Sequence, residues 1–127
     1  MILLDTHIWV WWADEDAQLS DSAKATIAQE TEVAISAISC WEIAKAAERG
    51  ALRLDGPLED WMGAALSEPR IRLIPLTPEI AIESTRLPRP FHRDPADQII
   101  VATARVLGAS LLTADRKIRR YPHVSTV

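Results

Sequence analysis

Short apolar runs alternate with longer stretches of helical periodicity along the whole chain. The apolar runs predict buried strands at residues 1–4, 32–35, 71–74 and 110–112, with a last edge strand near residues 123–125. The periodic stretches predict helices at residues 6–12, 20–30, 39–50, 57–66, 78–84 and 95–107, and a turn at 114–119. Strands that alternate with helices indicate an α/β fold whose parallel sheet is covered on both faces.

The segment from His92 to Arg105 contains the most clearly marked helix. Asp94 is a good N-cap, Pro95 suits the first helical position, and Gly108 is expected to end the helix. The residues that follow the first turn of this helix are nearly all apolar, so the helix is predicted to be largely buried. Asp94 and Asp97 both fall in its first turn, where the partial positive charge of the helix end favours anions.

Acidic residues recur where predicted strands lead into helices. Asp5 ends the first strand, Glu42 lies in the first turn of the helix after the second strand, and Asp115 follows the strand at 110–112. In a parallel sheet the carboxyl ends of the strands lie at one edge, where ligand crevices form. The sequence therefore predicts that these three acids meet Asp94 and Asp97 in one carboxylate cluster.

Helix capping is the alternative role for each acid taken singly. Asp5, Asp94 and Asp115 stand at helix or turn starts, and Ser39-x-x-Glu42 has the pattern of a capping box. Several like charges in one place, however, repel one another, raise carboxylate pKa values and reduce stability. A hard divalent cation relieves that repulsion, since Mg²⁺ takes oxygen ligands and is typically held by carboxylates together with a substrate phosphate. Such an ion suits phosphodiester hydrolysis, because it lowers the pKa of a bound water and neutralises phosphoryl charge.

Length and composition limit the class of protein. The 127 residues, 48% apolar and 25% charged, predict one soluble globular domain over residues 1–127. No apolar run approaches the roughly 20 residues that cross a membrane, and the start M-I-L-L-D-T-H lacks the basic segment of a signal peptide. Cys40 is the only cysteine, which excludes an internal disulfide and a cysteine-based zinc site and favours a cytoplasmic location.

Charge is distributed unevenly within the net value of −4. From residue 86 to the end there are eight Lys or Arg and three acids, all of them members of the predicted cluster, whereas the first 85 residues hold six bases and fifteen acids. The basic C-terminal third is either solvated surface or a surface that holds a polyanion beside the acidic site. Arg93 and Arg116 stand next to site acids and suit phosphate binding through their bidentate forks. His92 is a further candidate, as a phosphate contact or a proton donor.

Four segments taken together resemble a known family. They are M-I-L-L-D-T-H at the start, S-A-I-S-C-W-E-I-A in the middle, H-R-D-P-A-D-Q-I-I-V-A-T-A, and L-L-T-A-D near the end. In this order and spacing they resemble the PIN-domain ribonucleases, and most closely the VapC-type toxins of toxin–antitoxin pairs. The resemblance covers the whole chain, and the acids of the family match Asp5, Glu42, Asp97 and Asp115.

The resemblance implies a three-layer α/β/α sandwich around a short, mainly parallel sheet. It also implies Mg²⁺- or Mn²⁺-dependent endonucleolytic cleavage of RNA. The partners that it implies are a second copy of the chain, in a homodimer, and a cognate antitoxin whose C-terminal segment lies across the active-site groove.

Roles for the acids follow from the resemblance and from their chemistry together. Asp5 and Asp97 are expected to bind the metal directly, whereas Asp115 and Glu42 are expected to hold it through water or to bind a second ion. One of the latter two would orient or deprotonate the attacking water.

Three further residues have auxiliary roles in this prediction. Asp94 belongs to a subgroup pattern beside the shared acids and is expected to support the site or to act as an additional ligand. The hydroxyls of Thr6 and Thr113 suit hydrogen bonds to the carboxylates or to a phosphate, while their alternatives are a helix cap for Thr6 and a plain strand position for Thr113.

Five tryptophans are present, at positions 9, 11, 12, 41 and 61. Core packing is the default expectation for tryptophan, but three within four positions of one helix cannot all face inward. At least one of Trp9, Trp11 and Trp12 is therefore predicted at the surface, as an anchor for a dimer partner or antitoxin or as a platform for an RNA base.

Two other classes of function compete with the nuclease. A receiver-like signalling domain also gathers acids around Mg²⁺, but its acidic pair after the first strand is absent here, and Lys117 follows Asp115 inside a turn. A non-catalytic nucleic-acid-binding module on the same scaffold is the second alternative. The presence of all four family acids argues against it.

Overall fold

The structure, a computed structural model, describes residues 1–127 and contains four strands and seven helices. In chain order these are β1 (Ile2–Leu4), α1 (Thr6–Ala13), α2 (Asp21–Ala28), β2 (Val33–Ser36), α3 (Ala37–Glu48), α4 (Leu58–Leu66), β3 (Ile71–Ile74), α5 (Pro78–Ser84), α6 (Pro95–Leu107), β4 (Ser110–Leu112) and α7 (Arg116–Arg120). Strands alternate with helical segments, as the apolar pattern predicts.

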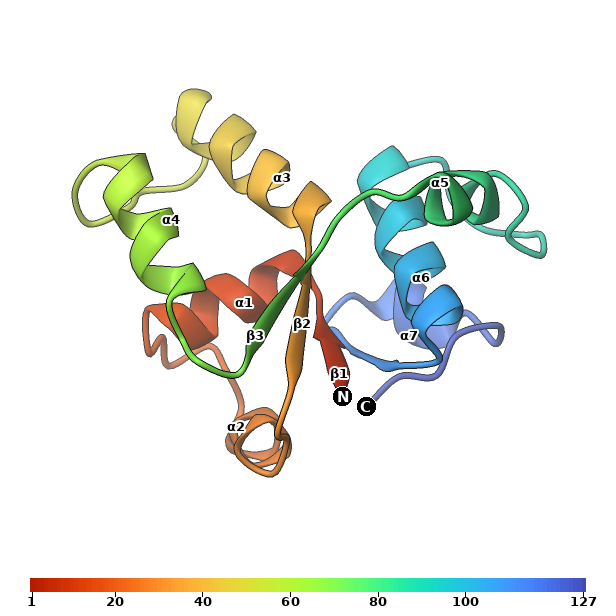
Figure 1. Cartoon of the computed structure of the whole chain (residues 1–127), viewed down its shortest axis with the longest axis horizontal. Helices are drawn as coiled ribbons and strands as arrows, with labels where there is room; N and C mark the ends of the chain where they lie inside the picture. Colours follow the sequence, from red (N-terminus) through yellow and green to blue (C-terminus); the bar gives the residue numbers. More distant parts are fainter.

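The four strands form one sheet in the order β3-β2-β1-β4, and every pair is parallel. The central strand is β1, in which Leu4 is aligned with Ile35 of β2 and with Leu112 of β4. Because this register brings the ends of the three strands level, the residues that follow them leave the sheet at one common edge (Figure 1).

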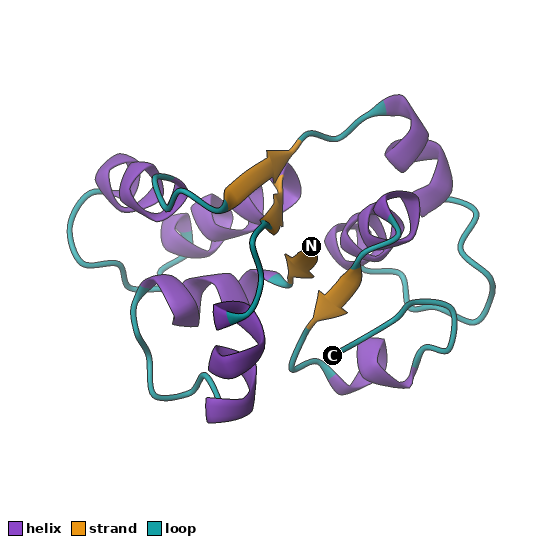
Figure 2. Cartoon of the chain, turned by 60° about the horizontal axis from the view of Figure 1, so that its bottom comes forward, coloured by secondary structure: helices purple, strands orange, loops and turns teal.

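Helices cover both faces of the sheet, so the molecule has three layers (Figures 1 and 2). On one side Leu4 packs in a cluster with Trp9 of α1, Ile27 of α2 and Trp61 of α4. On the other side Leu3 packs with Ile100 of α6. Successive residues of β1 thus enter opposite cores, and the predicted α/β/α sandwich around a parallel sheet is confirmed.

Helix α3 begins earlier than the sequence pattern predicts. Strand β2 runs to Ser36, whose side chain accepts a hydrogen bond from the Ile38 amide and so caps the helix. Ser39, predicted to open this helix, lies inside it and is completely buried, so no capping box forms with Glu42. The predicted position of Glu42 in the first turn was therefore wrong, and this residue lies in the second turn.

The C-terminal region also differs from the prediction. The segment predicted as a turn contains the short helix α7, which Asp115 caps by accepting from the Lys117 amide. The edge strand predicted near residues 123–125 is absent, and the chain end makes only one parallel bridge, between Leu111 and Thr126. Two backbone hydrogen bonds hold this segment, from the Leu111 amide to the Ser125 carbonyl and from the Val127 amide to the Leu111 carbonyl.

The tryptophans divide between the core and the surface. Trp9 is fully buried and its ring centre lies 5.6 Å from that of Trp61, whereas Trp11 and Trp12 are partly exposed, in agreement with the helical-spacing argument. The most exposed is Trp41 on α3, with 55% of its surface accessible, although core packing was the expectation for it.

None of the helices combines the length and the apolar character that a membrane crossing requires.

Gly108 and Gly63 lie on open surface and test how the backbone is arranged at the end of α6 and within α4. Gly108 ends α6 with a φ of +64°, and Gly63 lies within α4, and a methyl group at either position would meet no atom within 4 Å. We expect Gly108→Ala to destabilise the protein by about 1 kcal/mol, because L-residues are strained at this φ. Gly63→Ala should stabilise it by roughly 0.5–1 kcal/mol, because alanine favours a helix. Urea unfolding of both variants measures the difference, and changes of the same sign would contradict these assignments.

Candidate active site

The pairing of β1 with β4 places Asp5 beside Thr113. The Asp5 amide donates to the Leu112 carbonyl at 2.9 Å. Asp5 as a whole is only 5% exposed. One oxygen, Oδ1, accepts from the Thr6 amide at 2.8 Å and caps α1, while Oδ2 accepts from the Thr113 hydroxyl at 2.6 Å. The Thr113 hydroxyl in turn accepts from the Asp115 amide at 3.0 Å. Capping and site formation are therefore both roles of Asp5, and Thr113 ties it to Asp115.

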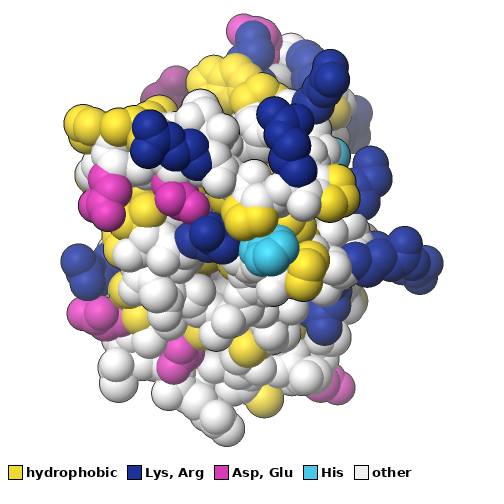
Figure 3. Space-filling model, turned by 90° about the vertical axis from the view of Figure 1, so that its right-hand side faces the viewer, with side chains coloured by type: hydrophobic (Ala, Val, Ile, Leu, Met, Phe, Trp, Pro, Cys, Tyr) yellow, Lys and Arg dark blue, Asp and Glu magenta, His cyan; other side chains and the backbone are white.

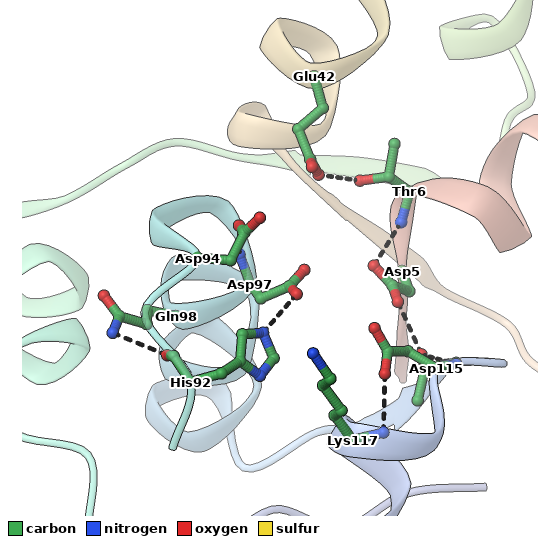
Figure 4. A network of polar contacts seen from close by, with 10 residues as sticks. Asp5, Thr6, Glu42, His92, Asp94, Asp97, Gln98, Asp115 and Lys117 are labelled. Carbon is green, nitrogen blue, oxygen red and sulfur yellow. Dashed lines mark hydrogen bonds and ion pairs between the residues drawn. The ribbon is translucent and has the colours of Figure 1, made fainter. Parts of the chain in front are cut away.

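Thr6 connects this edge of the sheet to α3. Its hydroxyl donates to Glu42 Oε1 at 2.6 Å and lies 2.8 Å from the Ser39 hydroxyl. Because a threonine hydroxyl has one hydrogen and gives it to Glu42, the hydroxyl of Ser39 is the donor to Thr6. This chain of hydrogen bonds holds Glu42 toward the carboxyl end of β1 (Figure 4).

The start of α6 supplies the other two acids. Asp94 caps the helix by accepting from the Asp97 amide at 3.0 Å, as predicted, and Pro95 occupies the first turn. An ionised Asp97 accepts a hydrogen bond of 2.7 Å from Nε2 of His92. The loop that carries His92 is fixed in place, since its carbonyl accepts from the Gln98 side chain at 3.0 Å.

Three of the five predicted acids form a close group. Glu42, Asp94 and Asp97 each offer a carboxylate oxygen within 4.8 Å of the other two. Asp5 and Asp115 lie outside this group, and Figure 4 places them together across from Asp97. The prediction of one cluster of five acids is therefore met only by Glu42, Asp94 and Asp97, which α3 and α6 carry, whereas the two acids that follow β1 and β4 lie outside the close group.

Burial and like charge act on two members of the group. The pKa of Glu42 is raised above the ordinary carboxylate value, first by burial and then by the negative charges of Asp97 and Asp5, against the lowering effect of Thr6. The pKa of Asp97 is also raised, first by burial and then by Asp94 and Asp5, whereas the hydrogen bond from His92 lowers it. The protein therefore holds these carboxylates together at an electrostatic cost.

The donor set fits a hard divalent cation. Glu42, Asp94 and Asp97 each use one carboxylate oxygen as acceptor within the protein, while Oε2, Oδ2 and Oδ1 respectively have no protein donor. Only Asp97 among the five acids has a basic partner within ion-pair distance, namely His92. Carboxylate oxygens free of donors and close together are the ligands that Mg²⁺ and Mn²⁺ prefer.

Three contributors to the site were not identified from the sequence. Ser39 was read as a helix cap, the partner of His92 was not foreseen, and Lys117 was noted only as part of a turn. Figure 4 shows the Lys117 ammonium group pointing into the space between His92 and Asp115. Nothing in the local sequence indicates the contact of Ser39 with Thr6, 33 positions away.

The two predicted phosphate-binding arginines are on the surface near these acids. Arg93 precedes Asp94 in the loop before α6 and Arg116 follows Asp115 in α7, and both are exposed and have no acidic partner. Neither makes a side-chain contact with the carboxylate group in the structure.

Comparison with known proteins gives the family. The family described as PIN domain matches residues 2–124. This chain belongs to the PIN-domain family. Ribonuclease VapC22 of Mycobacterium tuberculosis (strain ATCC 25618 / H37Rv) is 38% identical over 122 residues, which cover 96% of this chain and 92% of that protein. The resemblance to VapC-type PIN proteins noted from the four segments is thereby confirmed, and the receiver-like alternative is excluded.

Solved structures agree with this assignment. A toxin–antitoxin complex from Klebsiella pneumoniae contains a chain with a TM-score of 0.72 and 25% identity, over 99% of this chain and 97% of that one. FitAcB from Neisseria gonorrhoeae has a similar fold, with a TM-score of 0.69 at 22% identity, over 99% of this chain and 96% of that one.

The raised pKa of Glu42 predicts how the stability of the metal-free protein depends on pH. The folded protein binds a proton at Glu42 more tightly than the unfolded chain does, so stability falls as pH rises through the raised pKa. Glu42→Gln keeps an oxygen for Thr6 but removes the charge. We expect the variant to match the parent in acid and to exceed it in stability at neutral pH, as measured by urea unfolding in EDTA.

Glu59→Gln is the matched control, because Glu59 is an exposed acid in the first turn of α4. Its substitution should give no gain at neutral pH and a small loss, since it removes a favourable charge at a helix N-terminus. Equal behaviour of the two variants would mean that Glu42 is not held in an unfavourable environment.

Proposed function

We propose that this protein is a divalent-metal-dependent endoribonuclease and the toxin of a toxin–antitoxin pair, with residues 1–127 acting as one PIN domain in the cytoplasm. The observation that carries the proposal is the group of free carboxylate oxygens on Glu42, Asp94 and Asp97 in a PIN-domain chain. The name of the M. tuberculosis relative, a ribonuclease, supports RNA as the substrate.

The metal is proposed to be Mg²⁺, with Mn²⁺ as a substitute. Asp97, a member of the close group, is assigned as a ligand, and so are Asp5 and Asp115, which lie across from it and match acids of the family. Glu42 completes the catalytic set. When bound, the ion would lower the pKa of a water and neutralise charge on the scissile phosphate. Asp94 lies close enough to Glu42 and Asp97 to contribute a further oxygen.

The remaining site residues hold these groups in position. The Thr6 amide and the Thr113 hydroxyl orient both oxygens of Asp5. The Thr6 hydroxyl holds Glu42 Oε1 and leaves Oε2 without a protein donor. His92 donates to Asp97 Oδ2, which lowers the pKa of Asp97 against the larger effect of burial and leaves Oδ1 available. Glu42, whose pKa burial raises, is suited to accept a proton from the attacking water.

The proposed partners are an RNA substrate, an antitoxin and a second copy of the chain. Arg93 and Arg116 are exposed beside site acids and are assigned to RNA phosphates. A cognate antitoxin is proposed because the K. pneumoniae neighbour is a toxin–antitoxin complex. A homodimer is proposed because Leu73, Leu76 and Ile82 are each about half exposed, between 47% and 51%, on and after the edge strand β3.

Substitution of Asp97 tests the assigned reaction. Asp97→Asn keeps the shape of the side chain and an acceptor for His92, but it removes the charge that a cation needs. We expect metal-dependent cleavage of RNA to fall by more than about 100-fold, while thermal unfolding shows an intact fold. The assay compares purified, antitoxin-free protein in Mg²⁺, in Mn²⁺ and in EDTA.

Asp60→Asn is the control, because Asp60 is likewise an acid in the first turn of a helix but is exposed and far from the site in α4. It should retain parental activity. Undiminished cleavage by Asp97→Asn would show that the assigned site is wrong. RNA binding without cleavage by the parent protein would favour the non-catalytic binding module instead.

A further inference from the structure

A basic pocket adjoins the carboxylates on the side of α7. Its cavity of about 460 Å³ lies between the loop before α6 and the C-terminal turn. Three of its lining residues are cations, Arg89, Lys117 and Arg120, and no acid lines it. Figure 3 shows dark-blue side chains on the corresponding face of the molecule, around an exposed histidine.

The three cations have no acidic partners. Four other basic side chains, at positions 45, 70, 72 and 105, are each within 4.0 Å of a carboxylate, whereas Arg89, Lys117 and Arg120 are not. Like charges that line one cavity repel one another, and an anion bound between them offsets that repulsion. The pocket is therefore electrostatically complementary to a polyanion.

The walls of the pocket are fixed by packed aromatic rings. Phe91 is stacked on His92 at 4.4 Å between ring centres and meets the edge of Tyr121 at 4.8 Å. The Tyr121 hydroxyl donates to the Pro88 carbonyl at 2.6 Å, which joins the end of α7 to the loop that carries Arg89. The cations are thus presented from a preformed surface rather than from separate mobile segments.

The pocket is continuous with the metal-binding group. His92 lines it and also donates to Asp97. Lys117 lines it too, and Figure 4 shows its ammonium group directed toward the space beside Asp115. An anion in the pocket is therefore next to any phosphate held at the carboxylates, and adjacent phosphates of one nucleic-acid chain meet that requirement.

We propose that the basic pocket binds the phosphate backbone of the RNA nucleotide adjacent to the scissile bond, through Arg89, Lys117 and Arg120. This inference rests on the proposed function and adds a substrate subsite that Arg93 and Arg116 do not form. The contrast with the cavity between α1 and α4 supports it, because that cavity is lined by five acids and one arginine and repels a polyanion.

The test measures RNA binding without cleavage. A fluorescently labelled single-stranded RNA of mixed sequence is titrated with protein in EDTA at several salt concentrations. Lys117→Gln/Arg120→Gln should weaken binding and reduce the slope of log K against log salt by about 1.4, since each lost contact with a single strand contributes about 0.7. Arg89→Gln alone, at an exposed loop position, should reduce it by about 0.7 and serves if the double variant does not fold.

The matched control is Lys24→Gln/Arg53→Gln, which removes the same charge from exposed positions of α2 and the segment after α3. It should leave the slope unchanged. Equal slopes for the two double variants, or no RNA binding by the parent at low salt, would overturn the inference. Tighter binding of labelled polyglutamate than of RNA would instead assign the pocket to an acidic protein segment.

Failure of this inference is distinguishable from failure of the proposed function. If the pocket variant keeps parental binding while the parent cleaves RNA with Mg²⁺, the nuclease assignment stands and the pocket assignment is wrong. If the parent binds RNA through the pocket but cleaves none, the pocket is an RNA-binding site and the nuclease assignment is wrong.

Discussion

The parallel pairing of β1 with β2 and β4 is the constraint on which the site depends. It brings the residues after Leu4, Ser36 and Leu112 to one edge of the sheet, and these residues lead to Asp5, Glu42 and Asp115. The same pairing makes Thr113 a neighbour of Asp5, so that a contact across 108 positions of sequence orients the most buried carboxylate. A shift of register by one residue would turn Leu3 and Leu4 into the wrong cores and separate the acids.

Repulsion among the carboxylates at this edge of the sheet reduces stability, and nearby hydrogen-bond donors weaken that repulsion. Hydroxyl and amide donors from Thr6, Thr113 and the first turns of α1 and α6 stabilise the negative charges. They do not remove the repulsion, because burial and mutual charge still raise the pKa of Glu42 and Asp97. Under the proposed function a bound cation would offset this repulsion, and the basic pocket on the other side of His92 would provide the opposite charge that an RNA strand requires.

The sequence was informative wherever local chemistry decides structure. The N-cap at Asp94, the left-handed Gly108 and the apolar runs of the strands follow from neighbouring residues, and all were predicted. The capping-box interpretation of Ser39 failed because a tertiary contact with Thr6 buries that residue inside α3. The pairing of His92 with Asp97 joins residues only five positions apart, but the conformation of the loop before α6 decides it. The basic pocket arises from the docking of the C-terminal turn on that loop, which no local pattern encodes.

A crystal soaked in Mn²⁺ would show whether the acids at this edge of the sheet bind a divalent cation. Anomalous scattering from crystals soaked in Mn²⁺ would identify the ion without reliance on activity. We predict a peak at the carboxyl edge of the sheet, about 2.0–2.4 Å from an oxygen of Asp97 and bounded by the other acids. Absence of a peak there at saturating Mn²⁺, or a peak only elsewhere on the surface, would contradict it.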